Sequence, residues 1–197
     1  MNKLHSTEYR QSYQRLYGII GVLGMILPFL DVWKCGWHIP PSISESYYLG
    51  AIVPFVLILG SLGIIFFCNN GFDERDTIAN RISGICALGV ISFPCDSPKL
   101  LFGHIPFPAI HYVSASLLFT VFTYMCWFVF TELRSPKGWT HNKDKRNLIY
   151  RFCGFAIIIG MVLTVAKVIS IFWGEVIMLE AFGIAYLLQW KLILKDK

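Results

Sequence analysis

The sequence predicts an all-α protein: a polytopic membrane bundle of six transmembrane helices, in which residues 1–197 form a single integral membrane domain. Hydrophobic residues make up 55% of the chain and charged residues only 15%, whereas soluble domains carry about 25% charged residues. The chain therefore has too few charged side chains to cover a soluble globule. The lipid bilayer is the first partner that the sequence predicts.

The apolar segments are long enough to cross a bilayer as helices. Residues 49–68 contain no charge, and about 20 apolar residues are needed to cross a hydrocarbon core of ~30 Å. Helices are expected because a lipid-exposed backbone must satisfy its own hydrogen bonds. The third span is the shortest, since its apolar core covers only 82–95. The predicted spans are 16–33, 49–68, 77–95, 110–131, 148–172 and 175–194.

Basic residues are concentrated in alternate connections between these spans. The N-terminal tail, the loop after the second span, residues 132–147 and the C-terminal tail carry most of them, whereas the loops of the opposite side contain only Lys34 and Lys99. Loops rich in Lys and Arg stay cytoplasmic, so both termini are predicted to be cytoplasmic. This topology and attraction to an anionic membrane surface account for the net charge of +5. No nucleic acid partner is expected.

Two charged residues lie deep within the last two predicted spans. Only Trp173 and Gly174 separate these spans, so Lys167 and Glu180 are predicted roughly 10 Å below the outer end, at 1.5 Å per residue. Because intramembrane charges tend to pair or face the interior, we expect an ion pair or a wet cavity lined by both. The alternative is that Lys167 extends to the headgroups and Glu180 is protonated. Glu175 is predicted to open the last helix, where it complements the helix dipole.

Other polar residues gather on the predicted outer side. The segment "PPSISESYYLG" places several of them at the entry of the second span, and "HYVSASLLF" places two more on one face of the fourth span, three residues apart. Together they are expected to line an outward-facing cavity, with Asp31 near in depth. These candidate residues are Ser44, Glu45, Tyr48, His111 and Ser114.

The histidines and cysteines form no metal-binding motif. No H-x-x-x-H or C-x-x-C pair occurs in the chain, so neither a metal nor another cofactor is expected. Cys35 and Cys95 each lie in a predicted external loop, where an oxidising compartment permits a disulfide. Two separate thiols are the alternative.

Several strings between residues 43 and 183 resemble one known family in their order and spacing: "ISESYYLG", "GFDERDTIANRISGICALGVISFP", "HYVSASLLF", "KDKRNLIYRFCG" and "GEVIMLEAFG". The chain is similar to uncharacterised bacterial six-span membrane proteins related to the domain-of-unknown-function 998 group. The resemblance implies a six-span fold in the bacterial inner (cytoplasmic) membrane and implies no reaction. The chain departs from the family at Ala185, Tyr186 and Gln189, where the family has a serine–tryptophan pair and a lysine.

The predicted cytoplasmic loops form a second candidate region. The loop after the second span mixes acidic and basic residues, and residues 132–147 are polar and basic. Anchoring by positive charge on the inner side explains this composition, and docking of a cytoplasmic protein or an anionic ligand at 132–147 is the alternative. The candidate residues in these loops are Asp73, Asp76, Arg81, Lys145, Arg146 and Asn147.

These observations favour a non-enzymatic function. The expected protein has a polar seam that passes or senses an ion or a small solute, as a channel of several copies or as a membrane effector. Glycines in the first three spans permit close helix packing, either within one chain or in a homo-oligomer.

Two alternatives remain open. One is an intramembrane lipid hydrolase in which His111, with Glu45 or Glu180, activates water. The chain is loosely similar to the seven-span lipid hydrolases that include alkaline ceramidases and adiponectin receptors, but it lacks their zinc-binding histidine pair. The other alternative is a membrane anchor for a soluble partner.

Overall fold

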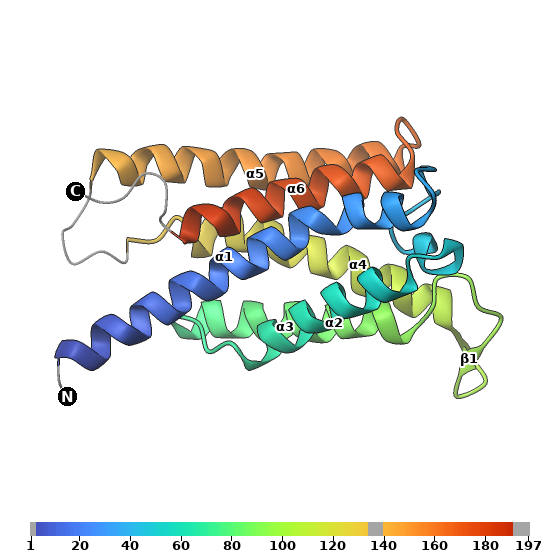
Figure 1. The fold of residues 1–197 in the computed structure, drawn as a ribbon, viewed down its shortest axis with the longest axis horizontal. Helices are drawn as coiled ribbons and strands as arrows, with labels where there is room; N and C mark the ends of the chain where they lie inside the picture. The colour runs from blue at the N-terminus through green and yellow to red at the C-terminus, as the bar shows by residue number, and fades with distance from the viewer. Residues whose placement is uncertain (1–2, 134–139, 191–197) are drawn as a thin grey trace.

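The computed structural model of the protein describes residues 3–133 and 140–190, and these form an elongated bundle of α-helices (Figure 1). α1 begins and α6 ends at the same end of the bundle. The other end holds a short β-hairpin and the α5–α6 turn, and we call it the hairpin end. We call the end at which α1 begins and α6 ends the opposite end. The helices are α1 (Lys3–Lys34), α2 (Ile52–Cys68), α3 (Glu74–Ser92), α4 (Phe107–Tyr124), α5 (His141–Val165) and α6 (Ile171–Gln189).

Shorter elements lie between the helices. The 3-10 helix η1 (Glu45–Leu49) lies in the 35–51 connection between α1 and α2, and β1 (Leu100–Leu101) pairs antiparallel with β2 (Ile105–Pro106) before α4. α4 continues into a π-helical turn, η2 (Met125–Val129), in which the Phe130 amide donates to the Met125 carbonyl at 2.8 Å. The prediction of a helical fold class is confirmed.

Four helical segments in the described part of the chain are long and apolar enough to cross a membrane: Gln14–Lys34, Phe107–Val129, His141–Val165 and Ile171–Gln189. α2 is apolar but has 17 residues, which is roughly 25 Å of helix. α3 is more polar, because it begins with "ERDTIANR". The fold is therefore all-helical with four candidate membrane-spanning helices, whereas six crossings and cytoplasmic termini stay predictions.

The predicted boundary between the last two spans is wrong. α5 ends at Val165 and α6 begins at Ile171, so the turn occupies 166–170 and lies before Trp173 and Gly174. Lys167 adopts a φ of 57°; its amide donates to the Thr164 carbonyl and the Val168 amide to the Leu163 carbonyl. This pair of hydrogen bonds is the Schellman ending of a helix. α6 therefore starts four residues before Glu175.

The helices approach closely where glycines face each other. A Cβ on Gly21 of α1 would lie 2.8 Å from the Gly183 carbonyl oxygen of α6, and a Cβ on Gly84 of α3 would lie 2.7 Å from the Gly63 carbonyl oxygen of α2. Such contacts leave no room for a side chain. The predicted glycine faces therefore pack within one chain.

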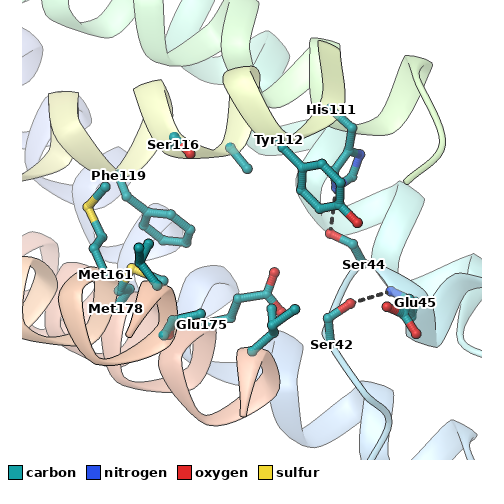
Figure 2. A pocket seen from close by; sticks show the side chains of 14 residues that line it. Ser42, Ser44, Glu45, His111, Tyr112, Ser116, Phe119, Met161, Glu175 and Met178 are labelled. Carbon is teal, nitrogen blue, oxygen red and sulfur yellow. Dashed lines mark hydrogen bonds between the residues drawn. The ribbon is translucent and has the colours of Figure 1, made fainter. Parts of the chain in front are cut away.

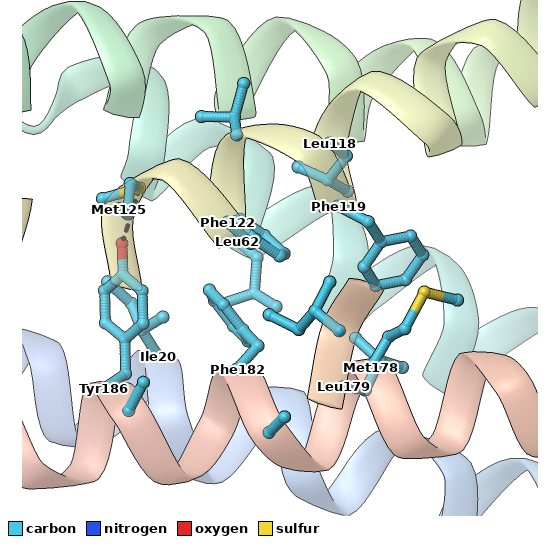
Figure 3. Close-up of a cluster of buried hydrophobic side chains, with 14 of the residues drawn as sticks. Ile20, Leu62, Leu118, Phe119, Phe122, Met125, Met178, Leu179, Phe182 and Tyr186 are labelled. Atoms are coloured by element: carbon cyan, nitrogen blue, oxygen red, sulfur yellow. Dashed lines mark hydrogen bonds between the residues drawn. The ribbon is translucent and has the colours of Figure 1, made fainter. Parts of the chain in front are cut away.

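Aromatic rings fill the middle of the bundle (Figure 3). Phe122 of α4 stacks on Phe182 of α6 with ring centroids 3.8 Å apart, and Phe66 of α2 packs against both. The buried Tyr186 hydroxyl donates to the Met125 sulfur at 3.7 Å. Aromatic pairs add about 0.5–1.5 kcal/mol each beyond the burial of their surface. This apolar core lies between polar clusters at the two ends of the bundle.

Candidate functional site

A cavity of about 210 Å³ lies between α4 and the α5–α6 pair at the hairpin end (Figure 2). Its wall along the helices is apolar, and its other side is polar. Tyr112, Val165 and Ile171 are exposed at its edge, so the cavity reaches the side of the bundle. The apolar wall comprises Ala115, Phe119, Met161, Val165, Ile171 and Met178, and the polar side comprises Ser42, Ser44, Glu45, His111 and Glu175.

His111 lies in the second turn of α4 and is 3% exposed. Its Nδ1 atom lies 2.9 Å from both the Val90 and the Phe93 carbonyl oxygens. Because carbonyl oxygens only accept, the hydrogen-bond network assigns the ring proton to Nδ1. In the neutral ring Nε2 is then an acceptor, so the Ser44 hydroxyl, 3.0 Å away, donates to it. The imidazole is held between the end of α3 and the 35–51 connection.

Glu175 fastens the 35–51 connection to α6. Its Oε2 atom accepts from the Ile43 amide at 2.6 Å, and the Phe172 amide donates to the Pro41 carbonyl at 3.1 Å. Within the connection, the Ser42 hydroxyl oxygen accepts from the Glu45 amide at 2.9 Å (Figure 2). The polar side of the cavity is therefore built by contacts between segments far apart in the sequence.

A third carboxylate lies behind the cavity, in the last turn of α1. Asp31 is 0% exposed, and neither of its carboxylate oxygens has a hydrogen-bond partner. Ser46 lies beside it, but the Ser46 hydroxyl donates to the Ile43 carbonyl at 2.6 Å instead. Asp31, Glu45 and Glu175 are close enough to interact electrostatically. Among the described residues that line the cavity there is no Lys or Arg, so its polar side is electronegative.

The structure brings together three of the predicted cavity residues, Ser44, Glu45 and His111, and adds Glu175, which was predicted at the start of the last helix. Ser114 shares the face of His111 but packs against Gly89 of α3. Tyr48 lies outside the cavity, where its hydroxyl donates to the Asp96 carbonyl at 3.1 Å. These two side chains stabilise the surroundings of the cavity.

The predicted ion pair between Lys167 and Glu180 is wrong. Lys167 is exposed in the α5–α6 turn, whereas Glu180 lies nine residues into α6, about 14 Å further along the helix. Glu180 is half-buried, and its Oε1 atom has no hydrogen-bond partner. Arg75 does form an ion pair, with Glu132. The prediction failed because it placed the turn too late in the sequence.

Of the two possibilities for Cys35 and Cys95, a disulfide or two separate thiols, the structure shows two separate free thiols. Cys35 follows α1, where burial, with a smaller contribution from Asp31, raises the pKa of its thiol. Cys95 is buried after α3 beside Tyr48. Across residues 3–133 and 140–190, no group of three His, Cys, Asp or Glu residues is arranged to hold a metal ion.

The acidic residues of the predicted loop after α2 have structural contacts at the opposite end. Asp73 caps α3 by accepting from the Asp76 amide at 2.8 Å. Asp76 is 0% exposed and accepts from the Phe72 amide at 3.0 Å and from Asn80 Nδ2 at 2.8 Å. Asn69 Nδ2 donates in turn to Asn80 Oδ1 at 3.2 Å. These residues close the α2–α3 loop.

The basic candidates of the predicted cytoplasmic loops divide into two groups. Arg146 and Asn147 are buried, whereas Arg81 and Lys145 are exposed. Residues 134–139 of the predicted docking loop 132–147 lie outside the described residues. Docking of a soluble partner at this loop stays a prediction.

Sequence reasoning missed several residues of the cavity: Ser42, Tyr112, Met161, Thr164 and Met178. Ser42 and Tyr112 lie close in the chain to Ser44 and His111, whose polar side chains in apolar surroundings did indicate the site. The methionines gave none, because a methionine in an apolar helix is typical of any core.

Comparisons with known proteins add no relative from which a role could be transferred. No protein-family model matches the chain, and no curated protein or solved structure matches it. What indicates a helical membrane protein is the set of four apolar helices itself. The resemblance to the six-span bacterial family stays a prediction.

Proposed function

We propose that the protein binds an amphiphile, with an apolar chain and a positively charged headgroup, in the cavity between α4 and the α5–α6 pair. The observation that carries this proposal is the composition of one continuous cavity: an apolar wall that meets two carboxylate side chains. A hydrocarbon chain fits the wall formed by residues such as Phe119 and Met178, and an ammonium group fits the polar side.

Charge favours a cationic headgroup. Glu45 and Glu175 line the cavity, and Asp31 lies close enough to interact with Glu175. Carboxylates in weakly hydrated surroundings require a proton or a counter-charge, and a bound ammonium supplies that counter-charge. Tyr112 adds an aromatic ring at the cavity edge, which can attract a cation through its face. An anionic headgroup would meet repulsion from the same groups.

The topology favours entry from the outer half of the membrane. The positive-inside rule directs the hairpin end away from the cytoplasm, and the resemblance to the six-span family implies the bacterial inner membrane. Exposed residues such as Val165 at the cavity edge offer a route from the lipid. Aromatic rings fill the middle of the bundle, so we do not propose a path for ions or solutes through a single chain.

Photocrosslinking in lipid nanodiscs tests this proposal. A long-chain alkylamine that carries a diazirine in its chain should label peptides of α4 and α6 at the cavity. An unlabelled alkylamine should compete, whereas the alkyl sulfate of equal chain length should not. Glu45→Gln should weaken labelling about tenfold, and the control Glu74→Gln, an exposed residue at the opposite end, should leave it unchanged. Equal competition by the sulfate would overturn the proposal.

A further inference from the structure

We infer that Ser44 and His111 form a serine–histidine pair that cleaves a carboxylic ester within the bound amphiphile. This inference rests on the proposed function, because the cavity that holds the amphiphile is the cavity that the pair lines. The ester would join the apolar acyl chain to the positively charged alcohol. Its carbonyl would then lie where the apolar wall meets the polar side, next to Ser44.

The protonation pattern of His111 is that of a general base. Its Nδ1–H points at the Val90 and Phe93 carbonyls, so Nε2 carries the free lone pair. The Ser44 Oγ atom lies 3.0 Å from Nε2, within the 2.6–3.2 Å over which a base can take a proton from a nucleophile. A hydrogen bond that only stabilises the fold does not depend on which ring nitrogen is protonated. In this arrangement Nε2 is unprotonated, which is the tautomer that a nucleophilic serine requires of its histidine.

The end of α3 supplies the third part of the arrangement. α3 ends at Ser92, and the Val90 and Phe93 carbonyls lie in and just after its last turn. Carbonyls at the carboxyl end of a helix lack intrahelical partners and carry partial negative charge. They orient the imidazole and favour the imidazolium that forms when Nε2 takes a proton. This is the positioning role that a carboxylate has in serine triads.

Ser44 and His111 are also accessible to a ligand while they are shielded from bulk water. Ser44 is 8% and His111 3% exposed, yet both side chains border the cavity (Figure 2). The Tyr112 ring lies 5.6 Å from the His111 ring, and its phenol lies at the same side of the cavity. Tyr112 therefore supplies a hydroxyl that can donate to the oxyanion formed during attack.

The reaction has two balanced steps. Ser44 Oγ forms a bond to the ester carbonyl carbon while its proton passes to His111 Nε2. The tetrahedral intermediate then breaks the carbon–oxygen bond to the alcohol, which takes the proton from Nε2 and leaves an acyl ester on Ser44. In the second step water attacks that ester, His111 again carries the proton, and the carboxylic acid departs. Glu45 and Glu175 hold the ammonium of the alcohol and so neutralise their own charge near the oxyanion.

Covalent labelling of the full chain in nanodiscs tests the inference. An alkyl fluorophosphonate should modify Ser44 in the wild-type protein, as read by peptide mass mapping. His111→Gln accepts the Ser44 hydrogen bond but cannot take its proton, so labelling should slow at least about 100-fold, as expected for loss of a general base. Ser61→Ala, which removes an exposed serine of α2 that is not among the residues lining this cavity, should label Ser44 at the wild-type rate.

Turnover and binding separate the two proposals. A long-chain acyl thiocholine should release thiol with the wild-type protein and with Ser61→Ala, but not with Ser44→Ala, while Ser44→Ala should still bind the alkylamine photoprobe. Wild-type protein that binds the photoprobe but neither labels at Ser44 nor releases thiol would overturn the inference and leave the proposed function standing. Labelling at Ser44 without specific alkylamine binding would instead overturn the proposed function.

Discussion

Buried carboxylates at the two ends of the bundle have opposite surroundings. At the opposite end, Asp76 accepts hydrogen bonds from the Phe72 amide and from Asn80. At the hairpin end, Asp31 has no hydrogen-bond partner on either oxygen, and Glu175 borders a cavity. Since burying a polar group without a partner costs free energy, the first arrangement stabilises the fold and the carboxylate of Asp31 does not.

The difference teaches where to look for function when comparisons supply no role to transfer. A buried polar group whose hydrogen bonds are satisfied within the chain is explained by its contribution to the stability of the fold. A polar group that lacks partners beside an open cavity lowers stability, and under the proposed function ligand binding accounts for its presence. Substitutions at the two ends should therefore change the free energy of unfolding in opposite directions.

The largest effect is expected at the opposite end. Asp76→Ala removes the acceptor of the Phe72 amide and of Asn80 Nδ2, so the free energy of unfolding should fall by about 2–4 kcal/mol. Unfolding by sodium dodecyl sulfate in mixed micelles measures it. The exposed neighbour Glu74→Ala should change it by less than about 0.5 kcal/mol. Similar losses in both variants would mean that the Asp76 network contributes nothing specific.

A smaller effect of opposite sign is expected at Asp31. Asp31→Leu replaces a partnerless carboxylate by an apolar group, so the free energy of unfolding should rise by about 0.5–2 kcal/mol, as is common when functional polar groups are removed. Labelling by the alkylamine photoprobe should weaken in the same variant. A loss of stability as large as that of Asp76→Ala would erase the contrast between the two ends.

The smallest effect is expected in the α5–α6 turn. Lys167 has a positive φ, which costs most residues about 1–2 kcal/mol, and glycine removes that cost but gains entropy in the unfolded chain. Lys167→Gly should therefore raise the free energy of unfolding by only about 0.5 kcal/mol. Lys167→Ala keeps the strain and should be neutral; a gain in the alanine variant alone would contradict this account of the turn.

Two helix ends show how far the sequence predicts the fold. α1 and α5 both end with the same pair of backbone hydrogen bonds, at Gly36 and at Lys167. Gly36 is the residue type that this ending favours, and the first span was predicted to end close to it. Lys167 gives no such signal inside an apolar run, so the turn was predicted several residues too late. The error in the predicted ion pair followed from that single residue.

The sequence predicted several residues of the site, but not which residues they contact. Polar residues in apolar surroundings identified Ser44, His111 and Glu175. Their partners are distant in the chain: Ser44 and His111 are 67 residues apart, and Ile43 and Glu175 are 132 apart. Such contacts depend on the docking of the 35–51 connection onto α4 and α6, which no local pattern encodes. The electronegative cavity therefore emerged only from the assembled fold.

The close crossing of α1 and α6 at Gly21 and Gly183 has a consequence for biogenesis. Ribosomes add about 5–20 residues per second, so the first helix to be made waits on the order of 10–30 s for its principal neighbour. During that interval the glycine face of α1 meets lipid or an insertion chaperone. A nascent chain stalled before α6 should thus expose this face to crosslinking, and its release should protect it.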